Sequence, residues 1–186
     1  MDLYTLRDLK KKSHSLSQNE LSDFEERMDY GVHSAELYDV FLSHPGLSTP
    51  LLCTIEGEFR KRGFSVLTLT GRNGKNGTFS SAVKKIFPRC NALVITDLYE
   101  KNFTWQDYHQ IGYFSCLKNR IAVLPILKKD VNTDTYQGRG IFAHYPYLGS
   151  GIVFMENRET YWVMRNPDSY VDFEYWLSAD PEYIDW

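Results

Sequence analysis

Short apolar runs that alternate with helical patterns dominate the sequence from residue 38 to residue 126. The apolar runs are residues 38–43, 64–69, 92–96 and 121–126. The helical patterns between them are residues 49–63, 80–88 and 105–118. Strands that are buried on both faces are apolar along their whole length, and helices join such strands and cover the sheet. The alternation therefore predicts an α/β fold with a central parallel sheet between two layers of helices.

The turns after these strands form the expected ligand-binding edge. In open parallel sheets, ligands bind at the carboxyl ends of the strands, near the point where the strand order reverses. This rule brings residues 43–46, the loop after Leu69 and residues 97–110 to one edge.

The two ends of the chain carry weaker patterns. In residues 1–35, sparse apolar positions predict two short amphipathic helices joined by a serine-rich link at residues 13–18. This extension either docks on the domain or on another subunit, or forms a mobile solvated arm. Residues 36–186 then form one domain. It becomes irregular after residue 127 and ends in an aromatic helix at residues 168–177, where we expect four side chains to face inward: Tyr170, Phe173, Trp176 and Leu177.

Charge and cysteine content exclude several classes of protein. The net charge of −3 gives no reason to expect nucleic acid or an anionic membrane as a partner. The cysteines, Cys53, Cys90 and Cys116, are odd in number and widely spaced, so we expect free thiols and no metal site. There is neither a secretory pattern at the N-terminus nor an apolar run of about 18 residues, so we expect a cytoplasmic protein.

Several segments resemble the TIR (Toll/interleukin-1 receptor) domain family. Tyr38 to His44 read Tyr-Asp-Val-Phe-Leu-Ser-His, which is similar to the first sequence box of TIR domains. The stretch from Gln110 to Phe114, followed by residues 121–126, resembles the Glu-Leu-Gly-Tyr-Phe and Val-Ala-Ile-Leu-Pro segments of stand-alone bacterial TIR proteins. Together with the segment at residues 145–147 and the terminal aromatic helix, the resemblance covers residues 36–178 and is closest to the Thoeris-type anti-phage group.

The resemblance implies a flavodoxin-like three-layer fold and an enzyme that uses NAD as a substrate, with no further cofactor. Such enzymes cleave the bond between nicotinamide and ribose. In anti-phage defence, a form of bacterial innate immunity, they make a cyclic or conjugated ADP-ribose signal. A separate effector protein reads that signal, and we expect the enzyme itself to form a homo-oligomer.

Gln110 occupies the position at which the family carries its catalytic glutamate. Cleavage of a glycosidic bond builds positive charge on the ribose, which a nearby carboxylate stabilises. Glutamine keeps the shape of glutamate, but it is neutral and cannot act as a base. The chain as written is therefore expected to be inactive, either as a natural relative without activity or through a deliberate Glu→Gln change. Gln110 as an ordinary solvated helix residue is the remaining alternative.

Other residues at the expected edge are candidates for substrate binding. Ser43 and His44 leave the first strand there, and Gly46 allows close approach of the backbone. His44 is either an acid or base, or a residue without a chemical role. On the following helix, Trp105 and Tyr108 are candidates for stacking on a ligand ring.

Three features of that helix leave alternatives open. Trp105 stands five positions before Gln110, where the family has four, so it is either a stacking residue or a packing residue at the helix start. Asp107 is either a substitute carboxylate or the partner of Thr104 in a helix cap. His109 points about 100° away from Gln110 around the helix, so we expect it to pack against neighbouring side chains.

The loop at residues 71–77 takes the place of the family's mobile BB loop. Its glycines, together with Arg72 and Lys75, could cradle a pyrophosphate, although the order of residues is not that of a nucleotide-triphosphate loop. A flexible surface turn is the alternative.

Three functions from different classes remain open on this basis. The first is an NAD-consuming signalling enzyme whose activity depends on position 110. The second is a non-catalytic TIR adaptor that acts by protein assembly. The third is a deoxyribosyltransferase-like enzyme, which also places a carboxylate near an anomeric carbon.

Overall fold

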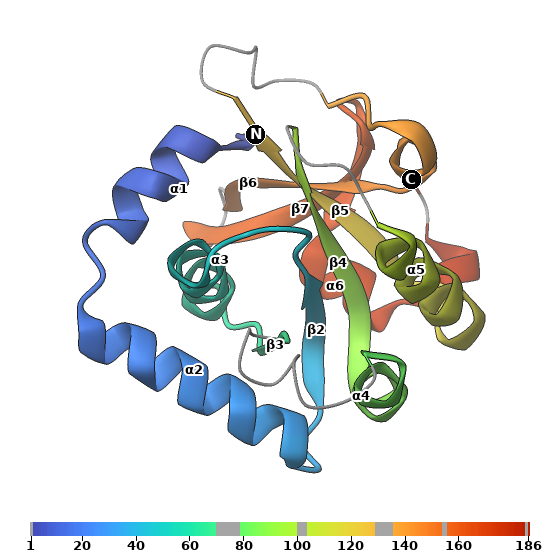
Figure 1. Cartoon of the computed structure of the whole chain (residues 1–186). Coiled ribbons are helices and arrows are strands. Elements are labelled where there is room, and N and C mark those ends of the chain that lie inside the picture. Colours follow the sequence, from blue (N-terminus) through green and yellow to red (C-terminus); the bar gives the residue numbers. More distant parts are fainter. Residues whose placement is uncertain (1, 70–78, 100–103, 129–135, 154–155, 185) are drawn as a thin grey trace.

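A central sheet with helices on both faces organises the chain (Figure 1). The computed structural model describes residues 2–69, 79–99, 104–128, 136–153, 156–184 and 186. Within this part the sheet has eight strands in the order β3-β2-β4-β5-β6-β7-β8, with β1 paired to β5. The strands are β1 (Tyr4–Thr5), β2 (Tyr38–Ser43), β3 (Val66–Leu67), β4 (Cys90–Leu98), β5 (Ile121–Leu127), β6 (Tyr147–Val153), β7 (Arg158–Asn166) and β8 (Ser169–Asp172).

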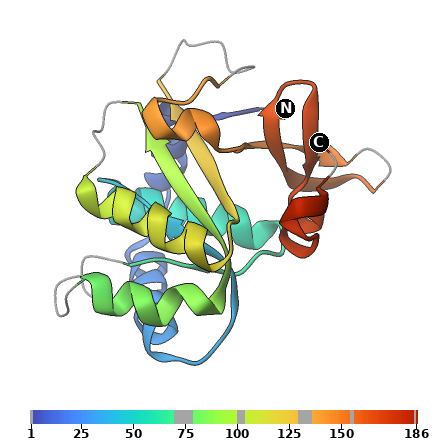
Figure 2. The ribbon, with the colours of Figure 1, turned by 90° about the vertical axis from the view of Figure 1, so that its right-hand side faces the viewer.

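The strands from β2 to β6 run parallel, and β7 and β8 extend the sheet in antiparallel fashion. In the series from β2 to β6, β3 lies outside β2, and β2 lies next to β4. This reversal of the first two strands of the series is the flavodoxin-like order. One face carries α1 (Leu6–Ser13), α2 (Gln18–His33) and α3 (Thr49–Lys61), and the other carries α4 (Phe79–Ile86) and α5 (Trp105–Leu117) (Figures 1 and 2). The predicted flavodoxin-like three-layer fold is confirmed.

Local sequence explains why the first β–α unit forms. β2 is apolar at Val40, Phe41 and Leu42, all of which are buried between the two helix layers. Pro50 lies in the first turn of α3, where its missing N–H costs no hydrogen bond. The helix ends before Gly63, whose φ of +87° is the left-handed conformation that glycine adopts without strain.

The C-terminal third differs from the sequence-based expectation. Residues 147–153, 158–166 and 169–172 form the strands β6, β7 and β8, and α6 (Phe173–Ser178) begins five residues later than predicted. The carboxylate of Asp172 accepts hydrogen bonds from the N–H groups of Glu174 and Tyr175, which sets the start of the helix. The predicted inward position of Tyr170 is therefore wrong: it pairs with Met164 in the sheet and is exposed.

The N-terminal extension packs on the body of the protein. The two predicted helices are confirmed as α1 and α2, and Leu9, Phe24 and Met28 are buried in the common core. α2 approaches the sheet so closely that a Cβ at Gly31 would lie 2.7 Å from Leu67 Cδ1. The docked alternative is thus correct and the mobile arm is wrong, while the domain boundary after residue 35 stays a prediction.

A buried ionic cluster ties α1 to α3. Glu58 accepts hydrogen bonds from Lys12 at 3.0 Å, from Lys61 at 3.1 Å and from Arg62 at 3.1 Å. Arg62 also pairs with Glu159 on β7 at 3.0 Å. The cluster therefore joins the N-terminal extension, the first helix of the domain and the antiparallel end of the sheet.

We expect Glu58 to make the stability depend on pH. Burial by itself would raise the pKa of Glu58, but hydrogen bonds from Lys12, Arg62 and Lys61 outweigh it and lower the pKa from 4.5 to about 2. A pKa below the unfolded value means that the stabilisation is fully present above pH 4.5 and is lost as the pH falls toward 2. The expected loss in the free energy of unfolding is about 1–3 kcal/mol, because the two lysines are exposed and solvent screens them.

Chemical unfolding of the natural chain and of a Glu58→Gln variant between about pH 2 and pH 6 measures this effect. The stability difference between the two proteins should shrink as the pH falls. A difference that stays constant over that range would contradict the assignment.

Two further expectations concern the cysteines and membranes. Cys53 and Cys90 are buried free thiols, and Cys116 is an exposed free thiol. Among the described residues, no helix has the length and apolar character to cross a membrane.

Candidate active site

The carboxyl ends of β2 and β4 form the point at which the strand order reverses. These two strands are neighbours, with Ser43 at the end of β2 paired to Ile95 of β4. β3 lies on one side of this pair and β5 on the other. In parallel α/β sheets this arrangement opens a crevice at the strand ends, and α5 begins shortly after β4.

His44 connects two loops of this edge. Its Nε2–H donates a hydrogen bond of 2.7 Å to the carbonyl of Leu69, at the end of the segment that follows β3. Burial lowers the pKa of His44, opposed by the Leu69 carbonyl and the charge of Asp107, so the neutral ring is favoured. In this tautomer Nδ1 is an acceptor, and it is buried without a hydrogen-bond partner among the described residues. A donor group on a ligand would satisfy it.

The first turn of α5 is fixed by a helix cap. Asp107 Oδ2 accepts hydrogen bonds of 2.7 Å from both the backbone N–H and the hydroxyl of Thr104. The predicted capping contact is therefore present, and it holds the carboxylate of Asp107 at the helix start. From there its charge acts on His44, which places the beginning of α5 close to the end of β2.

Gln110 is one turn further along α5 and faces the interior. Its side chain is 5 % exposed, and its Oε1 is buried without a hydrogen-bond partner among the described residues. The hydroxyl of Thr96, near the end of β4, is in the same state. A buried polar atom without a partner costs about 1–3 kcal/mol, so such atoms are rare in folded proteins. Gln110 Oε1 and His44 Nδ1 can each accept a hydrogen bond from a polar ligand, and the hydroxyl of Thr96 can donate one.

Two aromatic residues in the first half of α5 are exposed. Trp105 is 73 % exposed and Tyr108 is 48 % exposed. The Trp105 ring meets the ring of His109 edge-on at 6.3 Å, and His109 is itself exposed, so this contact lies outside the core. The alternative of Trp105 as a packing residue at the helix start is not tested by this contact. Its predicted role in stacking on a ligand stays a prediction, as does that of Tyr108.

A second polar cluster at the edge was not among the predicted site residues. Asp97, near the end of β4, is buried, pairs with Arg139 and accepts a hydrogen bond of 2.6 Å from the hydroxyl of Tyr136. Arg139 also donates to the carbonyls of Tyr99 and Leu98, at 2.9 and 3.0 Å. Asp97 follows an apolar run and could have been found from that position. No such sequence pattern pointed to its partners, Tyr136 and Arg139.

Some predicted residues lie beyond the described part. Arg72 and Lys75 belong to residues 70–78, which are outside it, so the predicted phosphate cradle stays a prediction. Gly46 has a φ of +73° in the turn after His44, where glycine is favoured. The described residues contain no group of three or more histidine, cysteine or acidic side chains arranged to hold a metal ion.

Comparison with known proteins agrees with this architecture. No protein-family profile matches the chain. The chain is 24 % identical, over 97 % of its own length and the full length of the relative, to a protein of Bacillus cereus (strain MSX-D12) named "Probable 3' cyclic ADP-D-ribose synthase ThsB'". This similarity along nearly the whole chain, together with the flavodoxin-like sheet, supports the resemblance to TIR proteins of the Thoeris type.

Proposed function

We propose that the chain binds NAD at the edge formed by β2, β4 and α5, and that position 110 decides whether the nicotinamide–ribose bond is cleaved. The relative's name describes a cyclic ADP-ribose synthase, an activity that begins with this cleavage. The observation that carries the proposal is the buried Gln110 side chain, which points inward at the switch of strand order with an unpartnered oxygen.

The chemistry depends on charge at this position. As nicotinamide leaves, positive charge develops on the ribose, and a buried carboxylate beside it stabilises that charge far more than the same group in water. The amide of Gln110 offers only a dipole. His44, half-buried at the end of β2 with its neutral ring favoured, is suited to hold a hydroxyl of the substrate but does not replace the missing negative charge.

Restoring a carboxylate tests the proposal. We expect a Gln110→Glu variant to release nicotinamide from NAD at least about 100-fold faster than the natural chain, which is the typical effect of one preorganised electrostatic group. Release is measured by chromatography, and the same traces show whether the ADP-ribose product is cyclic, linear or joined to an added acceptor.

A Gln18→Glu variant is the matched control, because it makes the same chemical change at an exposed position on α2. It should behave as the natural chain does. Absence of release from Gln110→Glu would reject the enzyme, and equal release from the natural chain would reject the role of position 110. Release of a base from deoxynucleosides but not from NAD would favour the deoxyribosyltransferase.

The proposed biological setting follows the relative as well. The product would act as a signal in anti-phage defence and be read by a separate effector protein, and the enzyme would work as a homo-oligomer in the cytoplasm.

The exposed aromatic face of α5 favours an adaptor as the second candidate, because Trp105 and Tyr108 present a surface for another protein. Inactivity of Gln110→Glu together with loss of self-association in a Trp105→Ala variant would support the adaptor.

A further inference from the structure

A second cavity lies at the opposite end of the sheet from the candidate active site. It has a volume of about 440 Å³. Asn119 and Ile121 at the amino end of β5 line it, together with Tyr145 and Pro146 just before β6. Since β2, β4, β5 and β6 run parallel, these amino ends are far along the strands from the carboxyl ends that hold His44 and Asp97. The two sites are therefore separate.

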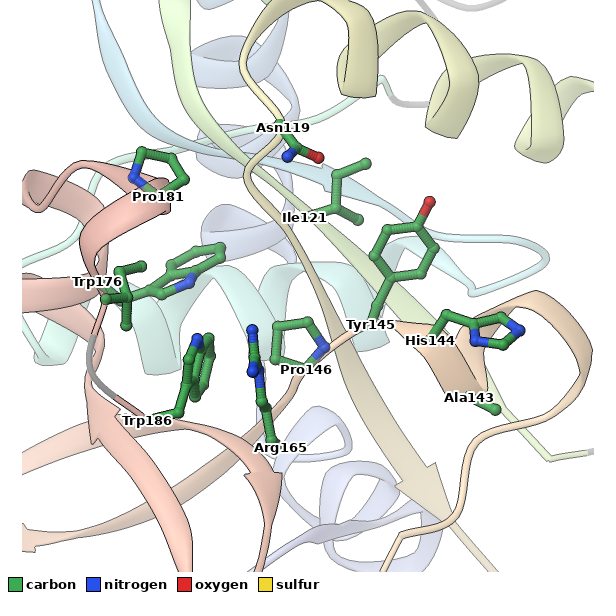
Figure 3. Close-up of a pocket in the computed structure, with 11 residues that line it drawn as sticks. Asn119, Ile121, Ala143, His144, Tyr145, Pro146, Arg165, Trp176, Pro181 and Trp186 are labelled. Carbon is green, nitrogen blue, oxygen red and sulfur yellow. The ribbon is translucent and has the colours of Figure 1, made fainter.

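Aromatic rings form much of the wall of this cavity. Figure 3 shows Trp176 from α6, Trp186 and Tyr145 around it. Trp176 is nearly fully buried, and its ring packs on Phe173 in the core at 5.6 Å, so this wall is firmly held. Rigid indole and phenol rings bind the flat faces of other aromatic molecules at little cost in conformational entropy.

A second arginine, Arg120, contacts the same wall. The guanidinium of Arg120 donates hydrogen bonds to the carbonyls of Leu177 and Ala179, which follow Trp176 directly. It also lies 5.8 Å from the centre of the Trp176 ring. These contacts fix the end of α6 and the indole together, so the cavity is already formed in the absence of a ligand.

Arg165 brings a positive charge to the wall of the cavity. Arg165 on β7 stands alongside the Trp186 ring, with its guanidinium carbon 4.3 Å from the ring centre (Figure 3). Within the described residues its guanidinium makes no ion pair or hydrogen bond. None of the 11 described lining residues has an acidic side chain. A guanidinium in this state is a ready donor for a phosphate or carboxylate.

We propose that this cavity binds a small planar aromatic anion, whose ring lies between the side chains of Tyr145 and Trp186, with buried Trp176 as the floor, and whose anionic group is held by Arg165. A volume of about 440 Å³ is within the range of small-molecule sites, and the polar side chains of Asn119, His144 and Arg165 line it beside the aromatic rings. A mononucleotide and an aromatic carboxylate share this chemistry. The proposal does not depend on the function proposed above.

Calorimetric titration of the full chain tests the proposal with four probes: AMP, benzoate, adenosine and inorganic phosphate. We expect AMP or benzoate to bind with a Kd below about 1 mM. Adenosine lacks the charge and phosphate lacks the ring, so each should bind at least about tenfold more weakly than AMP. Comparing AMP with benzoate then shows which class of aromatic anion the cavity prefers.

Variants locate the binding. Arg165→Gln should weaken the better probe about tenfold or more, and Arg165→Lys, which keeps the charge but not the planar fork, should weaken it less. Arg7→Gln, an exposed arginine on α1, is the matched control and should bind as the natural chain does. The proposal is overturned if neither anion binds, or if both bind Arg165→Gln as tightly as the natural chain. The proposal is also overturned if NAD displaces AMP and the Arg165→Gln substitution leaves the affinity for AMP unchanged.

Discussion

Replacing Arg62 with methionine lowers the free energy of unfolding by about 3–5 kcal/mol, the typical cost of removing one partner of a buried ion pair. The guanidinium is 6 % exposed and donates both to the backbone carbonyl and to the carboxylate of Glu58, at 2.9 and 3.1 Å. It also lies 4.8 Å from the centre of the buried Tyr161 ring. Methionine fills part of the volume but leaves these acceptors without their donor. Chemical unfolding followed by circular dichroism measures the change.

The control for this prediction is Arg60→Met on the same helix. Arg60 is 55 % exposed and pairs at 3.7 Å with the buried Glu56, which keeps a second partner in Arg27 at 3.4 Å, so we expect a loss of less than about 1 kcal/mol. A double variant, Arg62→Met with Glu58→Leu, removes both buried charges and should recover part of the loss. Equal effects of Arg62→Met and Arg60→Met would show that the buried cluster does not stabilise the fold.

Replacing Phe24 with alanine should cost about 3–5 kcal/mol of stability, the usual range for a large aromatic residue removed from a core. Phe24 lies on α2 in the N-terminal extension, has no exposed surface and belongs to the same hydrophobic cluster as Phe59 of α3. Because α2 shares this core with the sheet, we expect a single unfolding transition that moves as a whole to lower denaturant concentration.

Tyr30→Ala is the matched control, since Tyr30 is an aromatic residue on the same helix that is 64 % exposed. We expect it to change the stability by less than about 0.5 kcal/mol. If Phe24→Ala instead produced an early partial transition and left the main one unchanged, the extension would be an independent unit. That result would contradict the shared core.

The central strands could be predicted because each carries its own signal. The apolar run at residues 121–126 is buried on both faces in β5, so every position had to be apolar, whatever its neighbours were. The same holds for β2, whose predicted and observed bounds agree. The second strand was predicted too long: β3 spans only Val66–Leu67, and before it the N–H and hydroxyl of Ser65 donate hydrogen bonds to the carboxylate of Asp39.

Other parts could not be predicted because their partners are distant in sequence. The strands β7 and β8 are bordered by water on one side and contain exposed residues such as Tyr170, so they lack a continuous apolar run. The pair of Asp97 and Arg139 joins residues on separate segments, and no local pattern linked them. The docking of α2 depended equally on contacts that only the folded chain brings together.

By itself, the sequence determined the α/β class and the presence of an amide at position 110, and it predicted the edge at which a ligand would bind. Local hydrophobic patterns and the TIR-like segments were sufficient for these. Only the tertiary structure decided that Gln110 points inward with an unpartnered oxygen, that Asp107 caps its own helix, and that Arg165 meets Trp186 at a second cavity. The physical reason is that burial and pairing of polar groups depend on neighbours supplied by other elements, which local sequence does not specify.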